Sequence, residues 1–192
     1  MFTFGVEHEV AFLDRNGRFA DFHTTTFAEF DAIIAELPFY EGDYPQLRIG
    51  DAGIRRKRWY IEGLERFDET GRLIDYHAKG IEIRTTPHST IQGAIAELHE
   101  SFQLLRKVAN GVGFVPVLTS FNPYRTDFVP DPPLNPYEEM LLQQSPEDLT
   151  SLLAMLTYGP DLSISVQGLS SDSVIDIGRK FTYYSPYIVP FS

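Results

Sequence analysis

Two glutamates stand two positions apart in the N-terminal segment Gly5-Val6-Glu7-His8-Glu9. The surrounding stretch, Phe2–Leu13, is otherwise apolar and predicts a β-strand, in which successive side chains alternate between two faces. Glu7 and Glu9 therefore share one face beside Gly5, while His8 and the apolar residues share the other. Two neighbouring carboxylates on a buried strand repel each other and are costly to desolvate. Such a pair indicates either a bound cation or a role in proton transfer.

A third glutamate, Glu82, lies in a second apolar strand with the sequence Gly80-Ile81-Glu82-Ile83-Arg84-Thr85-Thr86-Pro87-His88. If this strand pairs with the first, Glu7, Glu9 and Glu82 form a cluster. Three carboxylates make a poor proton relay but a suitable site for Mg²⁺, which prefers oxygen ligands and usually bridges to substrate phosphates. Alternating charges on a strand are more often a solvent-facing sheet surface. The glutamate pair beside a glycine, close to a second strand of similar character, favours the cation site.

One basic cluster, Arg55-Arg56-Lys57-Arg58, stands out in this acidic chain. Arg56 and Arg58 are candidates for binding a phosphate or a substrate carboxylate, because a guanidinium group can hold either through two hydrogen bonds. A cluster that protects an edge strand from aggregation is an equally good interpretation. The sequence has no Walker loop, no GxGxxG after a strand and no GxSxG elbow. A bound nucleotide would therefore be held by a sheet face and a metal ion.

The composition limits the class of protein. The 192 residues are 43% hydrophobic, which suffices for one domain with a substantial core. A net charge of -11 argues against nucleic acid as a partner. There are no cysteines, so disulfides, thiol nucleophiles and zinc ribbons are excluded. No apolar run is long enough to span a membrane and no signal peptide is recognisable, so we expect a cytoplasmic protein.

Strands and helices alternate along the chain in a way that positions these residues. After the first strand, Asn16-Gly17 predicts a hairpin turn. The remaining strands are predicted at 19–22, 47–50, 56–67, 73–86, 114–119 (a buried strand) and 161–167, and helices at 26–37, 90–110, 137–144, 146–157 and 171–184. We therefore expect a single α+β domain over residues 1–192, with a curved, largely antiparallel sheet and helices on one face.

The two glutamate-bearing segments together resemble a known family. Gly5-Val6-Glu7-His8-Glu9 is similar to the opening Gly-x-Glu-x-Glu strand of glutamate–cysteine ligases, and in particular of the carboxylate–amine ligase branch related to glutamine synthetase. The segment from Gly80 to His88 resembles the second signature of that family, a Glu-x-x-Thr-Pro strand that leads into a long helix. Residues 181–191 are similar to a later helix with an Asn-Ser-Pro-Phe-like end.

The resemblance implies an enzyme that makes an amide bond. ATP would phosphorylate a carboxylate, usually the γ-carboxylate of glutamate, and an amine such as that of cysteine would attack the acyl phosphate, as in glutathione biosynthesis. Glu7, Glu9 and Glu82 would be Mg²⁺ ligands, and Arg84 would contact the substrate or a phosphate. Asp75 is a further candidate ligand, because some relatives carry an acidic residue seven positions before that glutamate. An odd separation places Asp75 on the opposite face from Glu82 unless a β-bulge near Lys79-Gly80 intervenes.

The chain also departs from that family. Where relatives often carry a His-x-His-type strand, this sequence has Asp161-Leu162-Ser163-Ile164-Ser165. Family members are considerably longer, so the chain would correspond to the N-terminal half of their catalytic domain. Two alternatives follow: a non-catalytic half-domain that binds a small amino-acid-like ligand or a partner subunit, including a second copy of the chain, and a metal-dependent phosphotransferase or hydrolase.

Overall fold

The first strand, β1 (Phe2–Leu13), is central to the sheet and pairs with four other strands. Its N-terminal half pairs with β6 (Pro160–Val166), and residues 7–10 pair on the other side with β4 (Leu73–Arg84). Its C-terminal end pairs with β2 (Phe19–Ala20) and β5 (Val115–Val117). The structure is a computed structural model that describes residues 1–47, 56, 58–144 and 152–188.

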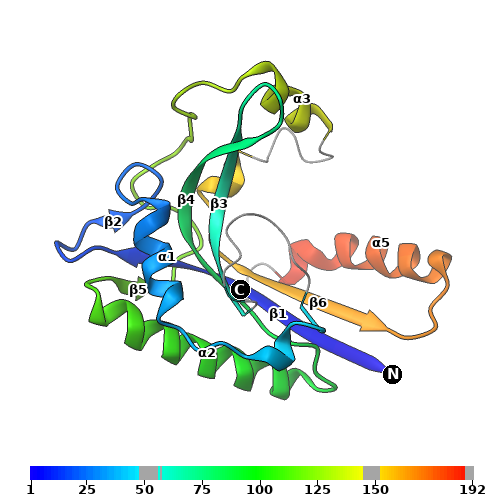
Figure 1. The fold of residues 1–192 in the computed structure, drawn as a ribbon. Coiled ribbons are helices and arrows are strands. Elements are labelled where there is room, and N and C mark those ends of the chain that lie inside the picture. Colours follow the sequence, from blue (N-terminus) through cyan, green and yellow to red (C-terminus); the bar gives the residue numbers. More distant parts are fainter. Residues whose placement is uncertain (48–55, 57, 145–151, 189–192) are drawn as a thin grey trace.

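All of these pairings are antiparallel, and β3 (Trp59–Phe67) completes the sheet beside β4. Within the described residues the sheet is open and has six strands, and four α-helices accompany it. The fold is therefore α+β, as the sequence predicts. β3 and β4 form a long twisted hairpin that extends away from the rest of the sheet (Figure 1).

Helices α1 (Phe27–Ala35) and α2 (Ile91–Gly111) cover one face of the sheet. Each begins at a threonine cap: the side chain of Thr26 caps α1 and that of Thr90 caps α2. The main core lies between this helical layer and the sheet, with Val10, Phe12, Ile81 and Ile83 from β1 and β4 fully buried. The side chains on the opposite face of β1 and β4 are the polar ones.

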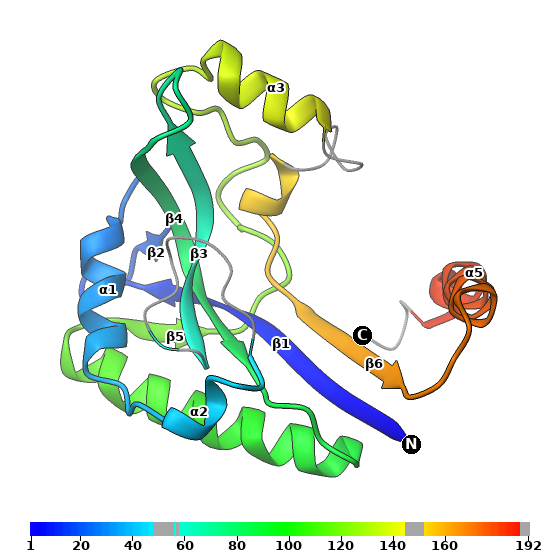
Figure 2. The same cartoon turned by 45° about the vertical axis from the view of Figure 1, so that its right-hand side comes forward.

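Two helices do not join this layer, contrary to the expectation that the helices pack on one face. α3 (Pro136–Gln144) lies at the far end of the β3–β4 hairpin, and α5 (Ser171–Ile188) runs back beside β6 at the margin of the sheet (Figure 2). Apart from half-buried Ser173, the described side chains of α5 are exposed. None of the described helices has an apolar stretch long enough to cross a lipid bilayer.

Other differences from the sequence prediction are local. The strand expected at 114–119 is shorter and only partly buried, because it lies beside the end of β1 and leaves Val115 48% exposed. In place of the end of a helix predicted over 146–157, residues Leu153–Met155 form a 3-10 turn (η2) and Thr157 forms a bridge with Phe121. The strand expected at 47–50 lies almost wholly outside the described residues, as does the first part of that helix.

Candidate carboxylate and guanidinium site

The pairing of β1 with β4 brings the two sequence motifs together. Glu9 lies directly opposite Glu82, and Glu7 lies opposite Arg84. On the other side of β4, Tyr60 of β3 lies opposite Glu82. Directly opposed residues of an antiparallel pair project from the same face, so these side chains share the face that α1 and α2 leave uncovered.

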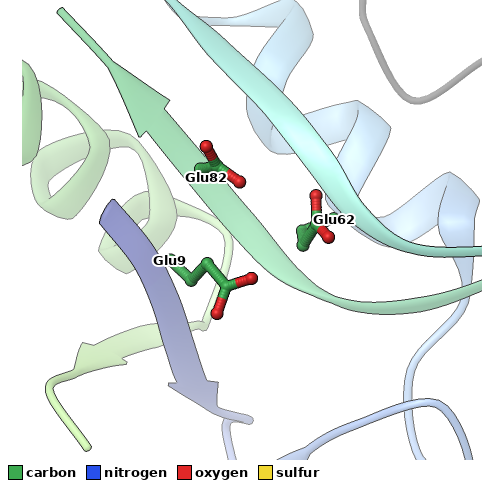
Figure 3. Close-up of side chains that lie close together, drawn as sticks. All are labelled: Glu9, Glu62 and Glu82. Carbon is green, nitrogen blue, oxygen red and sulfur yellow. The ribbon is translucent and has the colours of Figure 1, made fainter. Parts of the chain in front are cut away.

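Three carboxylates converge on this face, one from each of three adjacent strands. Oxygen atoms of Glu9, Glu62 and Glu82 all lie within 4.8 Å of one another. Figure 3 shows the three side chains reaching into the same space from β1, β3 and β4. Glu7 belongs with this group, because its charge and its hydrogen bond with Glu82 both raise the pKa of the Glu82 carboxyl. We call Glu7, Glu9, Glu62 and Glu82 the carboxylate cluster.

A β-bulge in β4 sets which residues face the cluster. Glu62 pairs with Gly80 and Gly63 pairs with Ala78, so Lys79 is left without a cross-strand partner. The core-facing residues are odd-numbered after the bulge, as with Ile81, and even-numbered before it, as with Ala78. The bulge lies at Lys79-Gly80, where the sequence requires one if Asp75 is to share a face with Glu82.

The bulge places Asp75 on the same face as Glu82, but not in the cluster. Asp75 lies opposite Arg66, well along the hairpin from the Glu62–Gly80 pair, and is exposed. Its carboxylate accepts a hydrogen bond from the backbone N–H of Tyr76. The structure therefore does not bring Asp75 together with the other predicted metal ligands.

Lys79 turns its buried side chain toward the cluster. Its side chain is 1% exposed, and Nζ donates to Oε1 of Glu9 at 2.7 Å. Nζ also donates to the carbonyl oxygens of Ala154 at 2.6 Å and Thr157 at 3.0 Å. All three ammonium protons thus have acceptors, and the lysine holds Oε1 of Glu9 in place.

The cluster is electrostatically costly in the absence of a cation. Burial above all, together with the charges of Glu62 and Glu7, raises the pKa of Glu82 to about 9, against a lowering hydrogen bond from Tyr60. Burial also raises the pKa of Glu9, although Lys79 opposes this. Oε1 of Glu82 is buried without a hydrogen-bond partner. An uncompensated oxygen among several hard oxygen donors suits a divalent cation such as Mg²⁺.

Arg84 lies beside the cluster and is 8% exposed. Its Cζ atom lies 4.2 Å from the centre of the Tyr60 ring, a cation–π contact. Nε and Nη2 of Arg84 are buried with no hydrogen-bond acceptor among the described residues. Arg84 is therefore the one sequence-predicted cationic candidate that the structure brings to this face.

The arginines of the basic cluster are placed elsewhere. Arg58 holds both carboxylate oxygens of Asp43 at 3.0 Å and also pairs with Glu97 at 3.1 Å. Its guanidinium group lies over the ring of Tyr40. Arg56 makes a long contact with the carbonyl oxygen of Ala35 at 3.4 Å. Arg58 connects β3 to α2 and to the turn at Asp43, so its side chain is committed to protein partners; Arg55 and Lys57 lie outside the described residues.

Three residues of this face are missed by the sequence analysis. Glu62 lies two positions after Tyr60 in the predicted strand and so on the same face. Only the register of the β3–β4 hairpin, however, shows that this face is also that of Glu82. Lys79 was noted only as a bulge position. Asp161 was read as part of a strand, yet it lies opposite Glu7 and its charge raises the pKa of Glu9.

Comparison of the chain with protein-family models and with curated proteins finds no match in either.

Proposed function

We propose that the protein is an ATP- and Mg²⁺-dependent ligase of the glutamate–cysteine ligase type, in the carboxylate–amine ligase branch. It would join a carboxylate, the γ-carboxylate of glutamate, to an amine such as that of cysteine. In the first step a carboxylate oxygen attacks the γ-phosphorus of ATP and ADP leaves. In the second the amine attacks the acyl carbon and phosphate leaves.

The convergence of Glu9, Glu62 and Glu82 within 4.8 Å is the observation that carries this proposal. Two of the three are the glutamates of the resembling motifs, and they lie opposite each other across β1 and β4. A surface row of glutamates would be solvated and dispersed, whereas Glu82 is 5% exposed.

The chain's own residues have separable roles in this proposal. The carboxylate cluster would hold Mg²⁺, which when bound screens phosphate charge. Lys79 keeps Glu9 in one orientation. Arg84 stands on the same face, on the side of Glu82 away from Gly80, where a reacting anionic group would lie. The predicted ATP-binding role of Arg56 and Arg58 has no support from their placement.

Calorimetric titration of Mg²⁺ tests the cation site. We expect wild type to bind Mg²⁺ and the variants Glu62→Gln and Glu82→Gln to bind it at least about tenfold more weakly, in line with lost ligands. Glu100→Gln is a matched control, because Glu100 is exposed on α2. Equal Mg²⁺ affinity in all four proteins would remove the basis of the proposal.

The reaction itself requires product analysis. A ligase should release ADP rapidly only when ATP, glutamate and an amine are all present. Release of ADP from ATP alone would instead support the phosphotransferase or hydrolase alternative.

A second function is favoured by one specific observation. α5 and β6 expose many large apolar side chains, more than isolated surface residues would explain. The exposed members of this set are Leu162, Ile164, Val174, Ile175, Ile177, Phe181, Tyr183, Tyr184 and Tyr187. This surface supports the alternative of a half-domain that associates with a partner subunit.

Sedimentation velocity distinguishes the two states of assembly. We expect the variant Leu162→Lys to shift the protein toward monomer, and the control Leu118→Lys to leave it unchanged, since Leu118 is exposed in a loop after β5. A wild-type protein that stays monomeric and well folded at high concentration would count against a subunit-binding role.

A further inference from the structure

A pocket of about 260 Å³ lies on the polar face next to the carboxylate cluster. It is formed by β1, β4 and β6, and its polar lining includes Glu7, Arg84, Thr85, Ser163 and Ser165. Gly5 contributes backbone alone to its wall. The pocket thus combines one guanidinium group with several hydroxyl groups, a donor-rich lining.

Arg84 differs from two other well-buried arginines of this protein in one respect. Arg58 uses Nε and Nη2 to hold Asp43, and Arg66 uses the same two atoms to hold Glu138 at 2.7 and 3.0 Å. In Arg84 these two atoms have no acceptor among the described residues. Leaving a buried charged donor without an acceptor is unfavourable, so the described residues leave Arg84 with two donor atoms that suit a bound acceptor.

The glycine at position 5 keeps the pocket open. A Cβ atom at Gly5 would lie 3.7 Å from Cβ of Ser163 and 3.9 Å from Oγ1 of Thr85, which are ordinary contact distances. The backbone therefore tolerates a side chain here, but any side chain larger than alanine would project toward the pocket lining. Gly5 thus lines the pocket without adding a side chain to it.

We propose that this pocket binds the oxyanion of a small ligand, a carboxylate or a phosphate group, through the guanidinium group of Arg84. This inference rests on the proposed function in one respect only: the anion lies beside the cation that the carboxylate cluster would hold. Guanidinium groups recognise both oxyanions through paired hydrogen bonds, and Ser163 and Ser165 offer hydroxyl donors to the remainder of the ligand.

The size of the pocket limits the ligand. Pockets for drug-sized ligands usually measure about 300–1,000 Å³, so the space here suits a small acid or a single phosphate group and not a whole nucleotide. Glu7 lies on the same lining and would repel an anion, so the ligand's charge should sit at Arg84.

Anion binding is tested in EDTA, without Mg²⁺ or ATP and at constant ionic strength, by calorimetric titration of succinate and, separately, of inorganic phosphate. We expect at least one of them to bind wild type and to lose about tenfold or more in affinity in Arg84→Gln. The control Arg106→Gln, an exposed arginine of α2, should bind as wild type does. The tighter of the two anions identifies the ligand as a carboxylic acid or as a phosphate.

A second variant guards against misfolding of Arg84→Gln. Gly5→Val leaves the guanidinium group in place and fills the pocket, and should also abolish anion binding, whereas Gly111→Val at the exposed end of α2 should not. No binding of either anion to wild type, or binding that survives in both pocket variants, overturns the proposal. The two proposals can fail separately, because this titration contains no Mg²⁺. If wild type binds an anion here but shows no Mg²⁺ site in the separate titration, only the proposed function is refuted. If wild type binds Mg²⁺ but neither anion, only the pocket proposal is refuted.

Discussion

The ammonium group of Lys79 lies 2.7 Å from Oε1 of Glu9, and both side chains reach this contact because β4 has a bulge at Lys79. The lysine is buried and the glutamate is 21% exposed on its side chain. The bulge therefore supplies a fixed positive charge next to a cluster of carboxylates. Without it, the strand would turn Lys79 toward the apolar core.

Replacing this lysine should destabilise the fold. We expect Lys79→Met to lower the free energy of unfolding by roughly 3 kcal/mol, because it leaves Glu9 without its partner and two carbonyl groups without a donor. Lys107→Met, at an exposed position of α2, should change the stability little. Urea denaturation of the two variants measures the difference, and equal midpoints would show that the Lys79–Glu9 pair is energetically unimportant.

Gly80 should not tolerate a side chain. A Cβ atom at this position would lie 2.5 Å from the carbonyl oxygen of Val10, within the backbone of the neighbouring strand. We expect Gly80→Ala to cost about 1–3 kcal/mol of unfolding free energy, as overpacking does, and to weaken Mg²⁺ binding by displacing Glu82. Gly42→Ala, where a Cβ atom meets nothing within 4 Å, is the control. A fully stable Gly80→Ala protein would contradict the described contact of β1 with β4.

The ion pair of Glu138 with Arg66 should make stability depend on pH in the acid range. Hydrogen bonding from Arg66 lowers the pKa of Glu138 from its usual 4.5 to about 2. Because the folded-state pKa is the lower one, this stabilisation is complete above about pH 4.5 and is lost as the pH falls toward 2.

Urea denaturation between pH 6 and pH 2.5 measures this dependence. Glu138→Gln should have a lower free energy of unfolding than wild type at pH 6, and this difference in free energy should decrease steadily toward pH 2.5. Glu139→Gln, at the exposed neighbouring position, should follow the wild-type curve. A constant gap across this range would mean that the carboxylate of Glu138 is not the titrating group.

Mg²⁺ and the anion of the Arg84 pocket should strengthen each other's binding. Glu7 contributes to both the cluster and the pocket lining, so a cation that offsets its charge removes a repulsion of the anion. We expect succinate or phosphate to bind several-fold more tightly with saturating Mg²⁺, and Mg²⁺ to gain by the same factor from the anion. Glu7→Gln should reduce this coupling while leaving anion binding in EDTA intact or improved. If Mg²⁺ and the anion bind wild type without changing each other's affinity, the two sites are not coupled and this prediction is wrong.

The sequence predicts the strands that carry the cluster because their patterns are strong and local. The alternation in residues 2–13 gives the correct faces for Glu7, Glu9 and His8, and the second motif gives Glu82. The turn at Gly71, where φ is 81°, and the caps of α1 and α2 also follow from residue type.

The sequence does not predict features that depend on register or on distant contacts. Glu62 faces Glu82 only because the β3–β4 hairpin pairs it with Gly80. The sequence indicates Arg58 as a candidate for binding a ligand because its actual partners, Asp43 and Glu97, are far from it in sequence. The 3-10 turn at Leu153–Met155 stands in place of the end of the helix predicted over 146–157, and Ala154 within the turn and Thr157 after it give their carbonyl groups to Lys79.

The position of β1 has a consequence for the order of events during synthesis. β1 leaves the ribosome before the other strands of this sheet, yet Phe2 finds its partner only at Val166. Its pairing with β4 can form much earlier, since Glu9 needs only Glu82. Contacts of low sequence separation form sooner than those that close long loops. The cluster could therefore assemble on a nascent chain while the pocket beside Arg84 still lacks the wall that Ser163 and Ser165 supply, so cation binding would precede anion binding during biogenesis.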